Sequence, residues 1–444
     1  MATSSSPLNL SRRGFLAAGS LAAAGTLAGC SGFTKSGSSG GSSSASKAGT
    51  LKFTTWGSDA EAAAFKQLVS SFEASHKGAK VDLRLVPYGE MFTGIDAGLQ
   101  SGTAPDVFRV DYGTLGVYSS KNVLMDLTST LDSSLTDDLI PALLQAVTFE
   151  KKVYGVPQET DTTAVLYRPD LLEAAGVTDI PDSLESAWSW EEFAAVSAKL
   201  KSSLKGNVSP FAYDWQELGA FRWLTWLFEA GGRLLEDDLR TPAVDSAAGR
   251  RAMDFTTGFF EKGWVPKNTS VKGATYPDAA FISGQVAMSF AGNFLLPGIA
   301  DGVKDKFEWK VTYQPKDARA SSDLGGNALV ATEDSKNKDL AAEFLTFMVE
   351  EKNMKLFCEK SLELPTRQSL VGQKLDFAVR PDLMPVYVDQ STTLTADDVA
   401  QTTVPFFGQV NTLLQDQLEL AFRGRQSAAD TLRKIADGIT AAAS

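Results

Sequence analysis

The segment Leu51-Lys52-Phe53-Thr54-Thr55-Trp56 alternates apolar and polar residues, and Ser58-Asp59-Ala60-Glu61 follows it after one glycine. The alternation predicts a strand, and the S-x-x-E spacing is that of a capping box at the start of a helix. Between Phe65 and Phe72 the apolar residues recur at i, i+3, i+4 and i+7, so they form one stripe on that helix. The folded part of the chain therefore begins with a strand and a helix whose apolar stripe packs against a sheet.

The same order of strands and helices continues along the chain. Such alternation indicates an α/β fold with a largely parallel sheet, and no internal repeat of roughly 20 to 50 residues points to a solenoid or propeller. Further strands are expected at 81–86, 107–110, 153–156, 164–167 and 286–290, and further helices at 90–99, 190–200, 221–230, 340–357 and 411–422.

The first thirty residues have the composition of a targeting segment. Arg12 and Arg13 precede a run of small apolar residues, 14–29, that is too short and too mildly hydrophobic to span a membrane comfortably. The arginine pair resembles a twin-arginine export signal, and Leu27-Ala28-Gly29-Cys30 resembles the cleavage box of bacterial lipoproteins. We therefore expect residues 1–29 to be a signal peptide. Cys30 would then be the lipidated first residue of a protein anchored to the outer face of the bacterial cytoplasmic membrane.

Composition limits the remaining classes of partner. Residues 30–49, the lipidated Cys and a Ser/Gly-rich linker, cannot bury enough apolar surface to order themselves. The net charge is −12, and loss of Arg12 and Arg13 with the signal peptide makes it −14. No cluster of Lys and Arg is present to bind phosphates, so we expect no nucleic-acid partner. Apart from Cys30 the only cysteine is Cys358, so no internal disulfide is expected.

From about Thr50 onward, a series of short motifs resembles family 1 of the extracellular solute-binding proteins, the maltose-binding type that serves ABC importers. Each motif is weak by itself, but their joint order behind a lipoprotein signal is specific. The motifs are Thr54-Thr55-Trp56, Ala104-Pro105-Asp106-Val107 before Asp111, Val153-Tyr154-Gly155-Val156-Pro157 before Glu159-Thr160-Asp161-Thr162, Gly231-Gly232, Val286-Ala287-Met288 with Gly292-Asn293-Phe294, and Gly325-Gly326-Asn327-Ala328.

The resemblance implies a two-lobed periplasmic-binding-protein-like fold of type II, with two α/β lobes joined by crossover hinge strands and a ligand cleft between them. It also implies a monomer that captures a sugar or oligosaccharide and delivers it to the permease subunits of an ABC importer. Neither a cofactor nor catalytic activity is expected, and the lipid would be the only membrane contact. The lobes are expected at 50–157 with 291–325 (N-terminal) and 158–290 with 326–444 (C-terminal), with crossings near 157–161, 290–293 and 325–330.

Sugar recognition needs flat aromatic faces for the apolar C–H face of the ring and carboxylates or amides for its hydroxyl groups. Trp56, Tyr88 and Asp111 each follow the carboxyl end of a predicted strand, where open α/β sheets bind their ligands. Glu159 and Asp161 fall at the first expected crossing. We predict that all five contact the ligand. Helix capping, hinge hydrogen bonds or a place at the cleft rim are the structural alternatives.

Five further residues complete the predicted site. Phe294 stands where many relatives in the family present a Trp, so its ring either stacks on a sugar or belongs to the core. Gly326 and Asn327 follow Gly325, where a glycine pair suits close approach of the backbone to a ligand, or an ordinary turn. Trp215 is a stacking candidate outside the predicted helix, with core packing as its alternative. Arg367 resembles an Arg found near the cleft in the family, and a surface role is equally open.

Other functions remain open at this stage. The same fold could bind a polyamine, a glycerol phosphodiester or a peptide. A secreted glycoside hydrolase would need two carboxylates about 5–5.5 Å or about 6.5–9.5 Å apart, and 54 acidic residues do not exclude such a pair. A metal site is not expected, because His76 is the only histidine and no zinc-ligand spacing is present.

Overall fold

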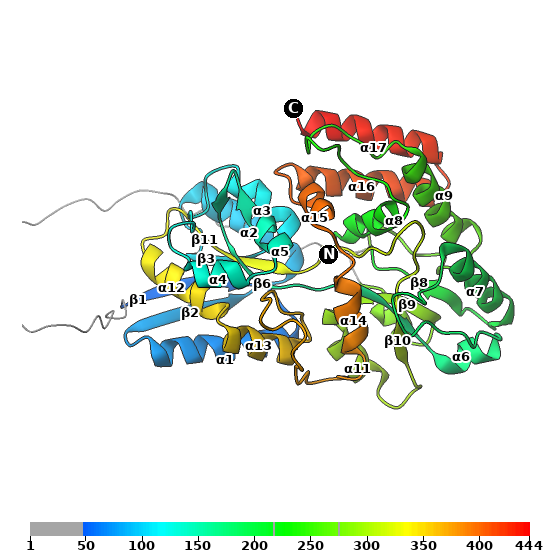
Figure 1. The fold of residues 1–444 in the computed structure, drawn as a ribbon, viewed down its shortest axis with the longest axis horizontal. Coiled ribbons are helices and arrows are strands. Elements are labelled where there is room, and N and C mark those ends of the chain that lie inside the picture. Colours follow the sequence, from blue (N-terminus) through cyan, green and yellow to red (C-terminus); the bar gives the residue numbers. More distant parts are fainter. Residues whose placement is uncertain (1–47, 216–217, 274–275) are drawn as a thin grey trace, which may run out of the picture. The chain divides into compact units, whose positions relative to one another are not determined.

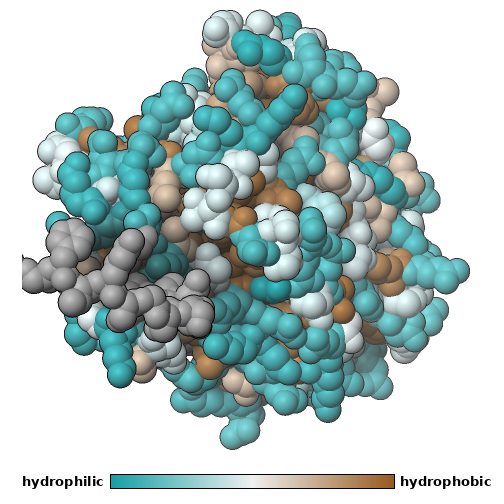
Figure 2. Space-filling view, turned by 60° about the vertical axis from the view of Figure 1, so that its left-hand side comes forward, coloured by the Kyte–Doolittle hydropathy of each residue, from teal (hydrophilic) through white to brown (hydrophobic). Residues whose placement is uncertain are grey.

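The structure is a computed structural model that describes residues 48–215, 218–273 and 276–444. The expected signal peptide, Cys30 and nearly all of the expected linker lie outside the described residues. The described residues form one compact unit with two main β-sheets, each covered by helices (Figure 1). We call the five-stranded sheet and its helices the first lobe, and the four-stranded sheet and its helices the second lobe. Figure 2 shows hydrophobic surface in the middle of one face, bordered by hydrophilic residues.

The first lobe is built on the strand order β2-β1-β3-β11-β6. The first three neighbours run parallel, and β11 is inserted antiparallel between β3 and β6. The parallel part places the carboxyl ends of three strands at one edge of the sheet, as the alternating sequence predicts. The strands are β1 (Gly49–Thr55), β2 (Ala79–Leu85), β3 (Val107–Asp111), β6 (Val156–Glu159) and β11 (Asn327–Ala331).

Each face of this sheet has its own apolar core. On one face lies α1, which begins at the Ser58/Glu61 capping box and buries the predicted stripe from Phe65 to Phe72, together with α12 and α13. On the other face lie α2, α3 and α5. The expected helix 340–357 is two helices in the structure. The bounds are α1 (Asp59–Ser75), α2 (Tyr88–Ser101), α3 (Tyr112–Ser119), α4 (Ser133–Asp138), α5 (Pro141–Ala146), α12 (Lys338–Met348) and α13 (Glu351–Ser361), with the small hairpin β4 (Thr148–Phe149) and β5 (Lys152–Val153).

The second lobe has the strand order β10-β7-β9-β8, in which β8 runs parallel and β7 antiparallel to β9. One face packs on α6 to α9, α16 and α17, and the other on α10, α11 and α14. The bounds are β7 (Thr163–Tyr167), β8 (Ser209–Ala212), β9 (Val286–Gly292), β10 (Lys310–Thr312), α6 (Pro169–Ala174), α7 (Trp190–Ser203), η1 (Gly219–Arg222), α8 (Trp223–Glu229), α9 (Ala247–Glu261), α10 (Asp278–Ile282), η2 (Asn293–Leu295), α11 (Leu296–Val303), α14 (Met384–Ser391), α15 (Ala396–Thr402), α16 (Phe407–Phe422) and α17 (Ala428–Ala442).

The expected lobe boundaries in the second half of the chain are wrong. The stretch 291–325, expected in the first lobe, carries β10, which pairs with β7 of the second sheet. The start of 326–444, expected in the second lobe, carries β11, which pairs with β3 and β6 of the first sheet. The expected crossing at 290–293 is not one, because β9 leads into α11 on the same lobe. An alternating sequence predicts that a segment is a strand, but it does not predict which sheet the strand joins. In this chain that choice depends on pairing between residues far apart in the sequence.

Three passages connect the lobes and lie against one another. The first runs from β6 to β7 through Thr160, the second from β10 to β11 through Gly325, and the third lies between α13 and α14 and includes Leu364. The Thr160 backbone exchanges two hydrogen bonds with Leu364, and Thr160 Oγ1 donates to the Gly325 carbonyl at 3.0 Å. The first two passages fall at two of the three crossings expected from the sequence.

Two helices near the C-terminus also touch both lobes. α15 packs on α5, and α16 packs on α3 as well as on α9 and α17. Glycine makes the contact with α3 possible, because a Cβ at Gly116 would lie 2.7 Å from the Thr403 carbonyl oxygen. This contact between α16 and the first lobe lies beside the cavity described next, because Thr402 and Phe407 line that cavity.

Candidate functional site

One cavity, with a volume of about 390 Å³, is lined from both lobes. The first lobe contributes the segments that follow the carboxyl ends of β1, β2 and β3. The passages contribute Asp161, Gly325 to Asn327, and Glu363, and the second lobe contributes η1, Tyr276 and η2. The α16 segment from Phe407 to Asn411 closes a further part of the wall.

The wall from the first lobe is aromatic. Trp56 follows β1 and Tyr88 begins α2, and their ring centroids lie 5.2 Å apart. Phe92, one turn further along α2, packs edge-on against Trp56 with centroids 5.8 Å apart. The Trp56 and Tyr88 side chains are half-buried, so each keeps surface toward the cavity. Because β1 and β2 pair in parallel, the segments that follow their carboxyl ends lie side by side. The rings of Trp56 and Tyr88 on these segments form one aromatic platform.

Asp111 lies at the end of β3 beside this platform. Tyr88 donates a hydrogen bond from its hydroxyl to Asp111 Oδ2 at 3.0 Å. Burial raises the pKa of Asp111 to about 6, and the hydrogen bond from Tyr88 offsets part of that rise. Burial and the Asp111 charge raise the pKa of Tyr88 above its usual range, which keeps the hydroxyl a donor. The pair offers fixed polar atoms next to an aromatic face.

The opposite wall comes from the second lobe. Tyr276 and Phe294 form an edge-to-face pair with centroids 5.5 Å apart. Arg222, at the end of η1, donates from Nε to Asp323 Oδ2 at 3.0 Å and lies 3.9 Å from Asp214 Oδ2. A Cβ on Gly219 would lie 2.5 Å from Arg222 Nη1, so this glycine leaves the space that the guanidinium occupies. Tyr276, Phe294 and Arg222 thus line the cavity from the second lobe, whereas the aromatic platform lines it from the first.

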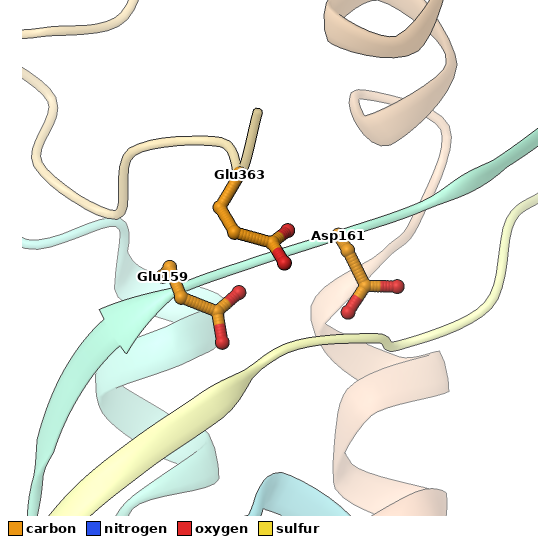
Figure 3. A group of neighbouring side chains, drawn as sticks. All are labelled: Glu159, Asp161 and Glu363. Carbon is orange, nitrogen blue, oxygen red and sulfur yellow. The ribbon is translucent and has the colours of Figure 1, made fainter. Parts of the chain in front are cut away.

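Three buried carboxylates form a cluster at the passages, and we call Glu159, Asp161 and Glu363 the carboxylate cluster (Figure 3). One oxygen of each lies within 4.8 Å of the others. Burial raises the pKa of all three, and the negative neighbours in the cluster raise the pKa of Asp161 and Glu363 further. Asn293 donates from Nδ2 to Glu363 Oε2 at 2.9 Å, and Asn327 donates from Nδ2 to Glu159 Oε1 at 2.6 Å.

A single buried guanidinium links this cluster to the aromatic platform. Arg109 on β3 is 1% exposed and bonds Glu61 Oε1 at 2.7 Å and Glu159 Oε1 at 2.8 Å. It also donates to the Trp56 carbonyl at 3.3 Å and lies 4.9 Å from the Trp56 ring centroid, within the range of a cation–π contact. Glu61 is the residue that completes the capping box of α1. Arg109 therefore holds the start of α1, the end of β1 and the end of β6 together.

Comparison with known proteins places this geometry in a family. The family described as "Bacterial extracellular solute-binding protein" matches residues 56–355. The chain belongs to this family.

Two relatives and one solved structure illustrate the likeness of this solute-binding protein. A relative named as an uncharacterised lipoprotein in the oleD 5′ region of Streptomyces antibioticus is 27% identical over 71% of this chain and 70% of its own length. The lactose-binding protein of Rhizobium radiobacter is 26% identical over 68% of this chain and 71% of its own. The GacH receptor of Streptomyces glaucescens GLA.O, solved unliganded and with acarbose, matches at TM-score 0.74 and 23% identity over 88% of this chain and 97% of its own. The structural likeness confirms the two-lobed type II periplasmic-binding fold.

Most of the predicted contact residues of the solute-binding protein surround the cavity. Glu159 does not line it, because the carboxylate is fully buried behind Asn327 and paired with Arg109. The residues that line it are Trp56, Tyr88, Asp111, Asp161, Phe294, Gly326 and Asn327.

Two predicted residues lie away from the cavity. Trp215 is fully buried in the core of the second lobe, where its ring stacks with Phe260 and packs on Phe422. Arg367 bonds Asp138 through Nε at 2.6 Å and donates to the Val349 carbonyl. Trp215 thus takes the core alternative, and Arg367 fixes a contact within the first lobe.

Sequence reasoning missed several residues around the cavity. Two had a usable signal: Arg109 interrupts a buried strand and Glu363 stands between two leucines, and a charged residue at such a position must be paired. Glu61 was predicted as the capping-box residue of α1 but not as part of the cavity wall. The others reach the cavity only through long-range packing and carry no local signal. They are Phe92, Leu218, Phe221, Arg222, Tyr276 and Asn411.

Proposed function

We propose that this solute-binding protein captures a sugar or short oligosaccharide and delivers it to the permease of an ABC importer. The observation that carries this proposal is the pairing of aromatic faces from the two lobes across one cavity, with carboxylates and amides beside them. Trp56 and Tyr88 line the cavity from the first lobe, and Tyr276 and Phe294 line it from the second. Aromatic faces suit the C–H face of a pyranose, and fixed acceptors and donors suit its hydroxyl groups. The lactose-binding relative supports the same ligand class.

The residues in this proposal have separate roles. Trp56 and Phe294 are the stacking surfaces, one from each lobe. Asp111, with Tyr88, and Asp161 accept hydrogen bonds from sugar hydroxyls. Gly326 has a φ of +96° and would place a Cβ 2.4 Å from Thr160 Cα, so it lets the second passage approach the first. Asn327 offers its carboxamide at the same place.

Capture of a ligand between two lobes suits a protein that transports the ligand and not an enzyme that converts it. The three adjoining passages form a hinge, and closure about it would bring the two aromatic walls onto one ligand. The protein acts as a binding protein with no catalytic step, and the monomer presents its closed form to the transmembrane subunits. Incubation with an oligosaccharide and assay for new reducing ends checks this point, and steady release of reducing ends would contradict it.

A panel titration tests the ligand class. Mono-, di- and trisaccharides are added to the purified protein while Trp fluorescence and thermal unfolding are followed. A ligand that binds only the native state raises its stability by RT ln(1 + [L]/Kd). We expect at least one sugar to shift both signals and Trp56→Leu to abolish the shift. Trp309→Leu is the matched control, because Trp309 is buried in the second lobe and does not line the cavity.

A polyamine is the second candidate ligand. Among the described residues that line the cavity are four carboxylates, those of Glu61, Asp111, Asp161 and Glu363, and one cation, Arg222. This balance favours a cationic ligand over a phosphodiester. Putrescine and spermidine therefore belong in the same panel, and a shift with these amines and with no sugar would overturn the sugar assignment while leaving the family intact.

The N-terminal segment supports export and lipid anchoring. Arg12-Arg13 and the Leu27-Ala28-Gly29-Cys30 box are the basis, together with a relative named as a lipoprotein. Among the residues that the structure describes, no helix has both the length and the apolar character to cross a bilayer. We expect membrane fractions to contain the protein in lipidated form, and Cys30→Ser to release it. Mass spectrometry of the N-terminal peptide decides, and an unmodified Cys30 in membrane-bound protein would contradict the anchor.

A further inference from the structure

The carboxylate cluster has an arrangement that hydrogen bonding inside the protein does not explain. Glu159 and Asp161 lie on the first passage, Glu363 lies on the third, and the three carboxyl groups turn toward one another (Figure 3). One oxygen from each carboxylate lies within 4.8 Å of the others, and all three side chains are buried. Three like charges at this spacing repel strongly in a medium of low dielectric constant, so something positive must accompany them when they are ionised.

Two carboxylate oxygens of the cluster lack partners. Among the described residues, Glu159 Oε2 and Asp161 Oδ1 have no hydrogen-bond partner, although both are buried. A neutral group gives a second, independent sign. Asn327 is 8% exposed, its Nδ2 is bonded to Glu159 Oε1, and its Oδ1 is buried without a partner. Buried polar atoms are usually satisfied, so unpartnered oxygens on three neighbouring side chains indicate a missing partner, either water or an ion.

The charges of the neighbouring residues do not cancel. Among the described residues, Arg109 is the one cation that forms an ion pair with the cluster, and it is shared between Glu159 and Glu61. Arg222 also acts on Asp161 through its charge, but it is paired with Asp323. When Glu61 and the three clustered carboxylates are ionised, their four negative charges are therefore not cancelled. A divalent ion would remove most of the surplus. Four oxygen atoms from carboxylates and a carboxamide are the kind of ligand that hard divalent cations prefer.

We propose that Glu159, Asp161 and Glu363, assisted by Asn327 Oδ1, form a binding site for a divalent metal ion, with Ca²⁺ as the preferred occupant. Ca²⁺ tolerates irregular coordination and bidentate carboxylates, whereas Mg²⁺ demands a near-octahedral set. A ligand amine fits less well, because Asp161 and Glu363 line the cavity but Glu159 does not.

A metal at this position would join all three passages between the lobes. Its ligands would come from the first passage, from β11 at the end of the second, and from the third. The ion would therefore stiffen the hinge and neutralise the carboxylates beneath the cavity, which leaves the cavity better suited to a neutral ligand. The site itself does not depend on the proposed function, since metal binding is measured without any sugar.

The test uses the purified full chain after treatment with a chelator. Isothermal titration calorimetry with CaCl₂ and with MgCl₂, and thermal unfolding with and without each salt, report on the metal alone. We expect one Ca²⁺ per chain, a rise in melting temperature, and weaker binding of Mg²⁺. Asp161→Asn and Glu363→Gln keep the shape of the side chains and are each expected to weaken Ca²⁺ binding by at least about tenfold.

Glu229→Gln is the matched control. Glu229 is likewise a fully buried carboxylate with an unpartnered oxygen, but its other oxygen accepts from Trp190 Nε1 and it lies outside the cluster. We expect this variant to bind Ca²⁺ as the wild type does. Absence of saturable binding to the wild-type protein would overturn the proposal even if a variant failed to fold. Equal Ca²⁺ affinity in wild type, Asp161→Asn and Glu363→Gln would overturn it as well. So would binding and thermal stabilisation seen with amine ligands but not with Ca²⁺.

Discussion

Replacing Arg109 by Met removes the guanidinium that bonds three parts of the site and keeps an unbranched apolar stem in place of the Arg methylenes. The replacement strips Glu159, which is fully buried, of its ion pair at 2.8 Å and Glu61 of its ion pair at 2.7 Å. Leaving one partner of a buried pair behind costs about 3–5 kcal/mol. With an unfolding entropy of about 2.1 cal/mol/K per residue over about 400 residues, this cost lowers the melting temperature by about 4–6 °C.

The double variant Arg109→Met/Glu159→Gln separates the charge from the packing. It removes the charge of Glu159, the more deeply buried of the two carboxylates that the single variant leaves unpaired, so we expect it to recover more than half of the lost stability. Denaturant unfolding followed by far-UV circular dichroism, in the presence of a chelator, gives the four free energies of the cycle. A cost below about 1 kcal/mol for Arg109→Met, or a double variant no more stable than the single one, would refute the reasoning.

Three further predictions concern the hinge, the pH response and the core. Gly326→Ala places a Cβ 2.4 Å from Thr160 Cα at a φ of +96°, and we expect it to lower the free energy of unfolding by more than about 2 kcal/mol. Gly102→Ala, at a φ of +69° with open space around it, is expected to lower it by about 1 kcal/mol. Equal melting temperatures for the two variants would contradict this prediction. Burial raises the pKa of Asp214 from 3.8 to about 6, so its contribution to stability is complete below about pH 4 and is lost as the pH rises to 6. The stability of Asp214→Asn relative to wild type should therefore rise by about 3 kcal/mol between pH 4 and pH 7, and a pH-independent difference in unfolding free energy would count against it. Trp215→Ala should lower the free energy of unfolding by about 3–5 kcal/mol yet leave the affinity for sugar unchanged, because Trp215 is fully buried in the core. If the variant is folded but binds sugar more weakly, Trp215 belongs to the binding site after all.

The first half of the fold could be predicted because its signals are local. The capping box at Ser58, the stripe of α1 and the strands 81–86 and 107–110 each follow from residues close together in the chain. Since parallel strands end at one edge of a sheet, the same local signals also placed Trp56, Tyr88 and Asp111 at one cavity.

Long-range pairing limited what the sequence could predict for the second half. Nothing within 286–331 distinguishes β9 and β10, which join the second sheet, from β11, which joins the first. Trp215 shows the same limit for side chains, since an indole serves a core as well as a cleft. The carboxylate cluster brings Glu363 next to residues about two hundred positions earlier, so no spacing rule could predict it.

The claim that one ligand bridges both lobes is tested most directly by calorimetric titration of the sugar that gives the largest thermal shift, with Trp56→Leu and Phe294→Leu side by side. Each variant alters one lobe, and neither ring contacts the other in the described pairs of aromatic residues. We expect each variant to weaken binding of the same sugar by at least about tenfold, or about 1.4 kcal/mol. Loss of affinity in only one variant, or in neither, would contradict capture between the two lobes.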